Sequence, residues 1–305
     1  MSSNKRKQEF DMKIKELLNL DNDCFGYNID GENYESYFNK NVWNEFYLEM
    51  QNKYPLFFKM YNNGSGGELE PKKQNGKLLP PKMASVASSS RFAYLSFRND
   101  AYSIIKNLLG DIEEGGVFRF EDRLSVKGVS ASANLDASYV TTHHAIYFEV
   151  KCHELFDSHY IDLSKSYFKN GVLYGDQINS LQLNCIQTIN SSKEGYYRIA
   201  KSEFGIEDNG KLYLDVKQFI CHLLGIANTK QDKKELIYLY FKPASLKSEF
   251  DFEFEMLEKQ FKAFCSSKYI SSFCERNKIS LRLVYAVNDK MTDEFNSVTV
   301  LKYSY

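Results

Sequence analysis

Three charged side chains, Asp136, Glu149 and Lys151, lie in two neighbouring segments that otherwise have the composition of β-strands. The segments are ANLDASYV at 133–140 and AIYFEVK at 145–151, in which apolar and aromatic residues recur at alternating positions. Successive side chains of a strand point to opposite faces, so Glu149 and Lys151 share one face. If the two segments pair as a hairpin, Asp136 reaches the same surface. The pattern therefore predicts two carboxylates and an ammonium side by side.

Two converging carboxylates, together with a carbonyl oxygen, are the ligands that a hard divalent cation such as Mg²⁺ requires. An ammonium beside such a metal can orient or help to deprotonate a water molecule, and it can offset charge on a phosphate. The residue types thus predict a site for metal-assisted hydrolysis of a phosphodiester bond. The alternative is an ordinary ion pair between Glu149 and Lys151 on a solvent-facing strand, worth about 0–1 kcal/mol.

The order Asp136, twelve intervening residues, then Glu149-Val150-Lys151 on a predicted hairpin resembles the PD-(D/E)xK nuclease superfamily. That superfamily includes type II restriction endonucleases and many repair and defence nucleases. The resemblance implies that Asp136, Glu149 and the carbonyl oxygen of Val150 bind Mg²⁺, for which Mn²⁺ could substitute. It also implies that Lys151 assists the attacking water. Leu135 stands where the family name has proline, a departure that is common within the superfamily.

A wider part of the chain, roughly residues 88–290, is similar to a group of bacterial restriction endonucleases. The segments that carry this similarity are FRFEDRLSV, ANLDASYV, YFEVKCHELF and KQFICHLLGI. In that group a glutamate precedes the aspartate, and a glutamine lies on the helix after the catalytic hairpin, which nominates Glu121 and Gln218. Glu113 and Glu114 lie just upstream and are alternatives to Glu121. For Gln218 the alternative is a solvated helix face.

The resemblance implies a restriction endonuclease-like fold, in which a mixed β-sheet is flanked by helices in three layers (α/β/α), here with an N-terminal helical elaboration. Apolar periodicity predicts helices at 5–20, 42–61 with an interruption near Pro55, 99–109, 177–189, 216–225 ending at Gly225, and 251–276. Alternating and continuous apolar runs predict strands at 117–126, 133–140, 145–151, 236–243, 280–287 and 297–305. We expect N-terminal helices with a flexible basic loop over 1–87, and a nuclease core over 88–305 with an insertion at about 152–214.

The segment 62–83, NNGSGGELEPKKQNGKLLPPKM, is rich in Gly, Pro and Lys and is predicted to be a long loop. Its GSGGEL stretch lacks the G-K-[ST] ending of a nucleotide-binding P-loop. The basic residues of this region are candidates for binding a nucleic-acid backbone: Lys72, Lys73, Lys77, Lys82 and Arg91. The alternative is a solvated flexible loop.

Composition narrows the class of protein. A net charge of −1 excludes binding of nucleic acid by bulk attraction, and 43% hydrophobic residues exclude a disordered chain. Six scattered cysteines without C-x-x-C spacing predict reduced thiols and a cytoplasmic protein. No signal-peptide core or membrane-length apolar run is found in the sequence, so we expect no membrane partner. The residues His143, His144, Cys152 and His153 match no zinc signature.

Together, the residues and the resemblance predict Mg²⁺-dependent hydrolysis of phosphodiester bonds in DNA, in restriction or defence against foreign DNA. An RNA nuclease or an enzyme acting on a small phosphate ester stays open, because recognition of the 2′-OH needs contacts that the sequence does not locate. A catalytically inactive nucleic-acid-binding or scaffold protein with the same fold is a further alternative. Double-strand cleavage commonly calls for two active sites, which makes a homodimer a candidate assembly.

Overall fold

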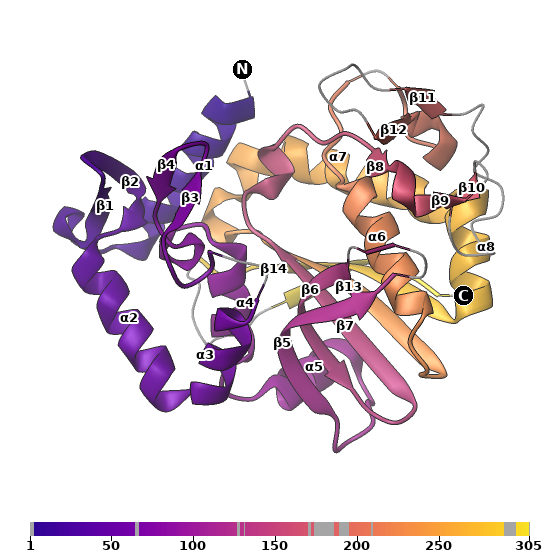
Figure 1. The fold of residues 1–305 in the computed structure, drawn as a ribbon, viewed down its shortest axis with the longest axis horizontal. Helices are drawn as coiled ribbons and strands as arrows, with labels where there is room; N and C mark the ends of the chain where they lie inside the picture. The colour runs from indigo at the N-terminus through magenta and orange to yellow at the C-terminus, as the bar shows by residue number, and fades with distance from the viewer. Residues whose placement is uncertain are drawn as a thin grey trace.

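A mixed six-stranded β-sheet forms the centre of the protein (Figure 1). The computed structural model describes residues 3–64, 67–126, 129–130, 132–169, 172–173, 186–188, 195–208, 210–289 and 297–304. The sheet has the order β15-β14-β13-β7-β6-β5. Its strands are β5 (Val117–Ser125), β6 (Ser132–Val140), β7 (His144–Lys151), β13 (Lys233–Phe241), β14 (Ile279–Ala286) and β15 (Ser297–Tyr303). Strands β5, β6 and β7 form an antiparallel meander, β13 is parallel to both β7 and β14, and β15 is antiparallel to β14.

Helices cover both faces of this sheet. On one face Phe219 of α6 stacks on Tyr238 of β13, with ring centroids 3.5 Å apart, and Phe264 of α7 packs against Phe219. On the other face Phe97 of α4 contacts Phe148 of β7. The helices of these two layers are α4 (Ser89–Phe97), α5 (Ala101–Leu109), α6 (Val216–Ala227) and α7 (Lys247–Ser266). Helix α8 (Lys268–Asn277) follows α7. The arrangement is a three-layer α/β/α architecture, as expected.

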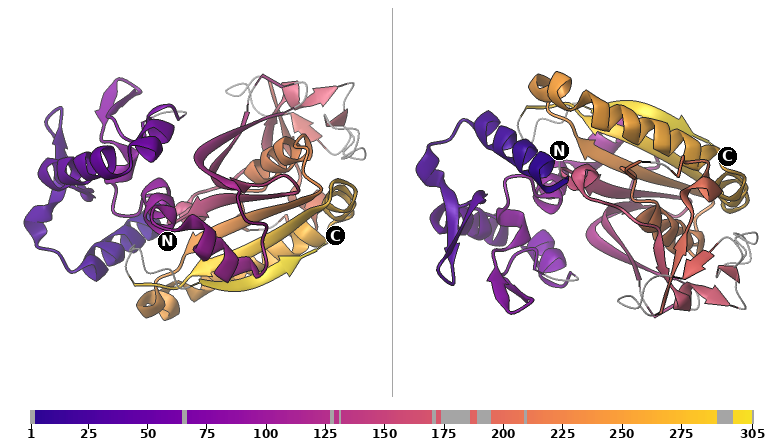
Figure 2. Two further views of the ribbon diagram at one scale, coloured as in Figure 1. Left: turned by 90° about the horizontal axis from the view of Figure 1, so that it is seen from below. Right: turned by 90° about the horizontal axis from the view of Figure 1, so that it is seen from above.

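The N-terminal elements gather at one side of the sheet (Figure 2). They are α1 (Ser3–Leu18), β1 (Phe25–Ile29), β2 (Glu32–Phe38), α2 (Lys40–Lys53), α3 (Pro55–Asn62), β3 (Lys72–Gln74) and β4 (Lys77–Leu79). Phe10 of α1 packs on Phe156, which follows β7, and Tyr61 of α3 stacks on Phe120 of β5 with centroids 5.0 Å apart. Aromatic packing therefore joins this part of the chain to the strands that carry the predicted site.

Most of the predicted elements are confirmed, and the differences are the following. The helix predicted over 251–276 is two helices that meet at Ser267, and the loop predicted over 62–83 contains the hairpin β3–β4. Helix α4 and the hairpin β1–β2 were not predicted. Of the helix predicted at 177–189, the described residues 186–188 instead form strand β11 (Ile186–Thr188), and the rest lies outside the described residues.

In the segment predicted as an insertion, the described residues form short strands and 3-10 turns. The strands described there, besides β11, are β8 (Asp162–Ser164), β9 (Phe168–Lys169), β10 (Val172–Leu173) and β12 (Tyr196–Ile199). Strands β11, β12 and β8 form a small antiparallel sheet. Among the described helices, none has the length and apolar character needed to cross a membrane.

Gly225 does not end helix α6 as the sequence suggested. The helix continues to Ala227, and Gly225 is buried where α6 lies across β5 and β6. A Cβ atom at this position would approach the Cβ of Ala133 to 2.7 Å and that of Leu124 to 3.1 Å. The glycine is needed for close packing of the helix on the sheet, which is how α6 reaches the site described below.

Candidate active site

The predicted site lies where strands β6 and β7 separate. Their backbone pairing ends at Ala137 and Phe148. One position further along, a side chain replaces the backbone partner, because Oδ2 of Asp136 accepts a hydrogen bond of 2.6 Å from the backbone N–H of Val150. Continuing the register places Asp136 opposite Glu149. The prediction that the two carboxylates share one hairpin is confirmed.

A third carboxylate comes from the neighbouring strand β5. Phe120 pairs with Ala137, which places the next residue, Glu121, opposite Asp136. The backbone of Glu121 has φ of 52°, in the left-handed region that costs a non-glycine residue about 1–3 kcal/mol. Strain of this kind persists where the surrounding structure holds the residue in place, which is common at functional sites. Three carboxylates thus lie at one level on three adjacent strands.

Glu149, Lys151 and Gln218 form a closed hydrogen-bonded triangle. The ammonium of Lys151 donates to Oε1 of Glu149 and, at 2.8 Å, to Oε1 of Gln218. The amide nitrogen of Gln218 donates to the same Glu149 oxygen at 2.7 Å. Glu149 and Lys151 are only 3% and 8% exposed, so the alternative of a surface ion pair is wrong. The alternative of a solvated helix face for Gln218 is wrong as well, because its side chain points into the site.

Helix α6 brings a second buried group beneath Glu149. Nε2 of His222 donates to the carbonyl oxygen of Asn134 at 2.9 Å, and Nδ1 accepts from the hydroxyl of Tyr238 at 3.0 Å. A carbonyl oxygen can only accept, so the proton lies on Nε2 of a neutral imidazole. Burial and the charge of Lys151 lower the pKa of His222 to about 3. His222 therefore joins β6 to β13 across the strand that carries Glu149.

The carboxylates destabilise one another's charged forms. Burial, then the charge of Glu149, raises the pKa of Asp136 well above its usual value. Burial raises the pKa of Glu149 to about 7, against the lowering effect of Lys151. Burial and the charge of Asp136 raise the pKa of Glu121 to about 8. Full ionisation of the three carboxyl groups would create more negative charge than their surroundings stabilise, and a bound cation would compensate this charge.

Lys151 remains protonated in this environment. Burial acts to lower the pKa of its ammonium group, but the charges of Glu149, Glu154 and Asp136 outweigh burial and raise the pKa above its usual value. A lysine in this state can donate hydrogen bonds and neutralise charge. It is poorly suited to remove a proton from water.

Glu68, from the N-terminal part of the chain, is a site residue that sequence reasoning missed. It is 5% exposed, and Oε2 accepts a hydrogen bond of 2.6 Å from the hydroxyl of Ser90. Its charge adds to those that raise the pKa values of Glu121, Asp136 and the buried Tyr61. Only the tertiary fold brings residue 68 to strands β5 and β6, so no local sequence signal pointed to it.

The two alternatives to Glu121 lie elsewhere. Glu113 accepts hydrogen bonds from the hydroxyl of Thr141 and the backbone of His143, at the turn that joins β6 to β7. Glu114 accepts a hydrogen bond of 3.0 Å from Tyr102 of α5. Of the three upstream glutamates, Glu121 is the one that lies opposite Asp136.

The predicted nucleic-acid-binding lysines divide into two groups. Lys72 and Lys73 are exposed on strand β3. Lys77 and Lys82 make ion pairs, with Glu32 at 2.6 Å and with Glu68 at 2.5 Å. Lys82 is thus the lysine of this set that pairs with Glu68, the carboxylate next to the cluster of Glu121, Asp136 and Glu149.

Arg91 does not belong with these lysines. It is 5% exposed, donates a hydrogen bond of 2.9 Å to the carbonyl oxygen of Val86 and lies over the ring of Phe38, 4.3 Å from its centroid. Burial lowers the pKa of its guanidinium to about 10. The prediction that Arg91 binds a nucleic-acid backbone is wrong, because the side chain is inside the protein.

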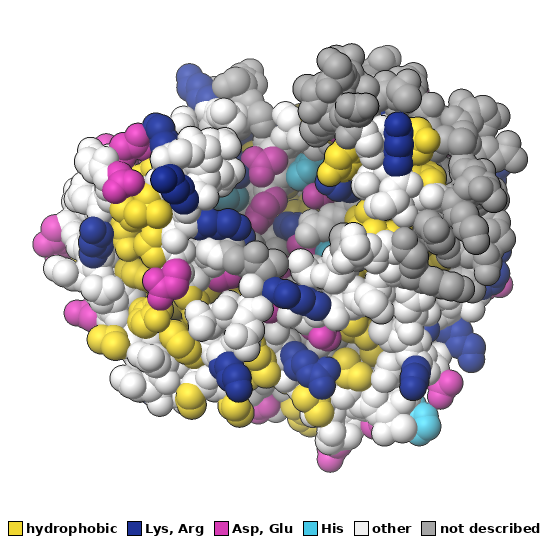
Figure 3. All heavy atoms as spheres, in the orientation of Figure 1, with side chains coloured by type: hydrophobic (Ala, Val, Ile, Leu, Met, Phe, Trp, Pro, Cys, Tyr) yellow, Lys and Arg dark blue, Asp and Glu magenta, His cyan; other side chains and the backbone are white. Residues whose placement is uncertain are grey.

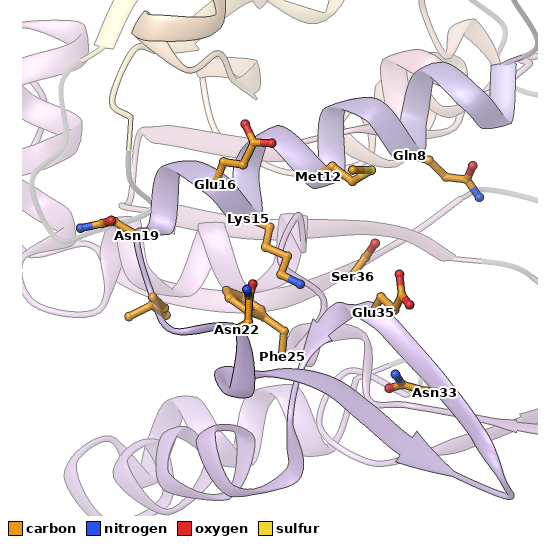
Figure 4. A pocket seen from close by; sticks show the side chains of 11 residues that line it. Gln8, Met12, Lys15, Glu16, Asn19, Asn22, Phe25, Asn33, Glu35 and Ser36 are labelled. Carbon is orange, nitrogen blue, oxygen red and sulfur yellow. The ribbon is translucent and has the colours of Figure 1, made fainter.

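The surface over the middle of the molecule is hollowed. Figure 3 shows acidic side chains on the floor of this hollow and basic side chains around it. A separate groove of about 710 Å³ lies between α1 and the hairpin β1–β2 (Figure 4). Lys15 points into that groove over the ring of Phe25, with Nζ 4.5 Å from the centroid. None of the carboxylate-site residues lines the groove, so it is not part of the site.

The donor set suits a hard divalent cation that keeps much of its water. Within the described residues, no group of three His, Cys, Asp or Glu side chains is spaced to hold a metal ion. A cation at the hairpin would therefore be held by Asp136, Glu149 and the carbonyl oxygen of Val150, with water completing its shell. Mg²⁺ is commonly bound in this way, through one or two carboxylates and several waters.

Comparisons with known proteins found no relative of this chain. The chain matches no family model, no curated protein and no solved structure.

Proposed function

We propose that the protein is a metal-dependent nuclease that hydrolyses phosphodiester bonds in DNA, with a restriction endonuclease-like fold. The observation that carries the proposal is the junction of Asp136, Glu149 and Lys151 where β6 and β7 separate. Support for the fold comes from an antiparallel meander joined to a parallel strand, with helices on both faces. A role in restriction or defence against foreign DNA follows from the resemblance of the segment Asp136 to Lys151 to the PD-(D/E)xK nuclease superfamily.

Each residue has a distinct part in the proposed reaction. Asp136 and Glu149 would hold the cation, which when bound would supply polarisation of the scissile phosphate and a lowered pKa of a bound water. Lys151, held protonated, orients that water and offsets charge that develops on the phosphate. Gln218 fixes Lys151 and Glu149 relative to each other through its two hydrogen bonds. Glu121, once ionised, would add negative charge next to Asp136 and so increase the affinity for a cation.

Cleavage of supercoiled plasmid and of single-stranded DNA in Mg²⁺, Mn²⁺ or EDTA tests the proposal directly. Wild type is compared with Glu149→Ala and with Glu207→Ala, a matched control on the surface, where Glu207 pairs with Lys259. We expect metal-dependent cutting by wild type and by the control, and loss of cutting in Glu149→Ala. A folded wild type that binds DNA but cuts neither substrate would favour an inactive binding protein.

Competition with RNA separates the remaining alternatives. If RNA of the same sequence is cleaved at least as fast as DNA under the same conditions, the substrate class in this proposal is wrong. Cleavage of a small phosphodiester at the same site, with neither nucleic acid cut, would identify a phosphoesterase instead.

A further inference from the structure

Glu68 links the segment that follows the hairpin β3–β4 to helix α4. Its two carboxylate oxygens have different partners: Oε2 accepts from Ser90 of α4 at 2.6 Å, and Oε1 accepts from the ammonium of Lys82 at 2.5 Å. Glu68 is 5% exposed, whereas the side chain of Lys82 is 61% exposed. The ion pair therefore runs from the interior to solvent, with its negative end fixed and its positive end accessible.

Backbone contacts close the segment at the same place. The N–H of Lys82 donates to the carbonyl oxygen of Gly67 at 2.8 Å, and that of Met83 donates to the carbonyl oxygen of Glu68 at 3.0 Å. The chain between these contacts carries the exposed Lys72 and Lys73. These contacts fix the main chain of Lys82, and the ion pair with Glu68 then fixes its ammonium.

The same pair lies next to the carboxylate cluster. The charge of Glu68 acts to raise the pKa of Glu121 and that of Asp136, whereas the charge of Lys82 acts to lower that of Glu121. Tyr61, buried between these groups, donates to the backbone carbonyl of Ser90 at 3.1 Å, which fixes α3 against α4 at this point. Ser90 contacts both Glu68 and Tyr61, and Tyr61 stacks on Phe120, the neighbour of Glu121. Lys82 thus lies at the solvent edge of the proposed active site.

We propose that Glu68 is a positioning residue that holds the ammonium of Lys82 at this edge, where Lys82 binds a phosphate of the substrate backbone next to the one that is cleaved. This inference rests on the proposed nuclease function. It also gives the order of the lysines along the substrate. Lys82 contacts the phosphate nearest the carboxylates, and Lys72 and Lys73 on β3 contact phosphates further away. Phosphate contacts of this kind fix the register of a nucleic acid without reading its sequence.

The test measures binding of a labelled DNA duplex in EDTA as a function of salt. Each lost phosphate contact reduces the slope of log K against log salt by about 1. We expect this reduction in Lys82→Ala and in Glu68→Gln, and no further reduction in the double variant, because Glu68 acts through Lys82. Lys259→Ala, which removes an exposed, ion-paired lysine on α7, is the matched control and should keep the wild-type slope.

Steady-state cleavage gives a second readout that a purely structural role would not produce. A lost backbone contact raises KM several-fold with little change in kcat. A wild-type salt slope and KM in Lys82→Ala, which changes an exposed side chain, would overturn the inference even if Glu68→Gln is unstable. A fall in kcat at unchanged KM in Glu68→Gln would also overturn it. If wild type itself neither binds nor cuts DNA, the proposed function fails first.

Discussion

The carboxylate of Asp136 accepts a hydrogen bond from the backbone N–H of Val150, at 2.6 Å, where a backbone carbonyl of a continuing ladder would otherwise accept it. Strands β6 and β7 are therefore separated by a side chain at the position where the site begins. Asp136 serves the fold through this contact and serves the proposed chemistry through its charge. The two roles can be separated by substitution.

Asp136→Asn should separate them. The amide oxygen of asparagine can still accept from the N–H of Val150, whereas alanine leaves that donor without its partner, at a cost of about 1–3 kcal/mol. We expect Asp136→Asn to unfold at the wild-type temperature or higher, and Asp136→Ala to unfold at a lower one. The cleavage rates of both variants should fall by more than roughly 100-fold. Loss of a residue that only hydrogen-bonds to a metal ligand typically costs about 10- to 100-fold. Equal melting temperatures for the two variants would contradict the structural role.

His222→Phe should weaken catalysis without preventing substrate binding. The substitution removes the two hydrogen bonds that join Asn134 and Tyr238 beneath Glu149. Because His222 supports the site from below, we expect kcat to fall about 10- to 100-fold with KM little changed. Tyr238→Phe, which removes one of these bonds, should have the smaller effect.

Nuclear magnetic resonance checks the state assigned to His222. The nitrogen shifts of the imidazole should show a proton on Nε2 and no titration at pH 5 or above, since its pKa is lowered to about 3. Protonation of His222 near pH 6.5, the usual value, would show that the ring is not buried as described.

Glu121→Gln should change the pH dependence of stability in metal-free protein. The folded-state pKa of Glu121 is raised to about 8 from an ordinary value of 4.5. Between these values the unfolded chain has lost a proton that the folded chain keeps, so this residue makes stability fall as pH rises through that window. Glutamine has no proton to lose. The melting temperature of the variant minus that of wild type should therefore grow from pH 4.5 to pH 8.

Two controls accompany this prediction. Added Mg²⁺ should stabilise wild type more at pH 8 than at pH 5, because it compensates charge that is present only at the higher pH. The exposed Glu207→Gln should show no such trend. A difference between Glu121→Gln and wild type that is independent of pH would show that Glu121 titrates like an exposed carboxylate.

Gly225→Ala should destabilise the protein, although alanine is the better helix former by about 1 kcal/mol. The added Cβ would lie 2.7 Å from the Cβ of Ala133. Forcing helix α6 away from the sheet should cost more than the helix gains, with a net loss of roughly 1–3 kcal/mol in urea unfolding. The double variant Gly225→Ala/Ala133→Gly removes the clashing atom and should recover part of the loss. A stabilised single variant would disprove the close packing.

Local patterns in the sequence predicted the elements that carry the proposed chemistry. Alternation placed Glu149 and Lys151 on one face of a strand, and the spacing to Asp136 matched a hairpin. Local patterns could not predict which element packs over that face. The strand β7 is buried along its whole length, because helix α6 lies over the side that the hairpin alone would leave exposed.

Contacts between distant segments account for what was missed. Glu68 acts on the site from a loop and His222 from the middle of helix α6, and neither carries a local signature. Helix α4 was hidden by its serine-rich start, although Ser88 accepts a hydrogen bond from the backbone of Arg91 as a helix cap does. Arg91 was misassigned because a sequence does not distinguish an arginine that lies inside the fold from one on a surface loop.

The alignment of Glu121, Asp136 and Glu149 across three adjacent strands limits how the length of this region can change. Removing or adding one residue inside β6 would turn Asp136 to the opposite face of the sheet, because side chains alternate with a period of two. Insertions in the turns between these strands leave the alignment intact. In related chains, insertions and deletions should therefore occur in the turns and not within the strands that carry the three carboxylates.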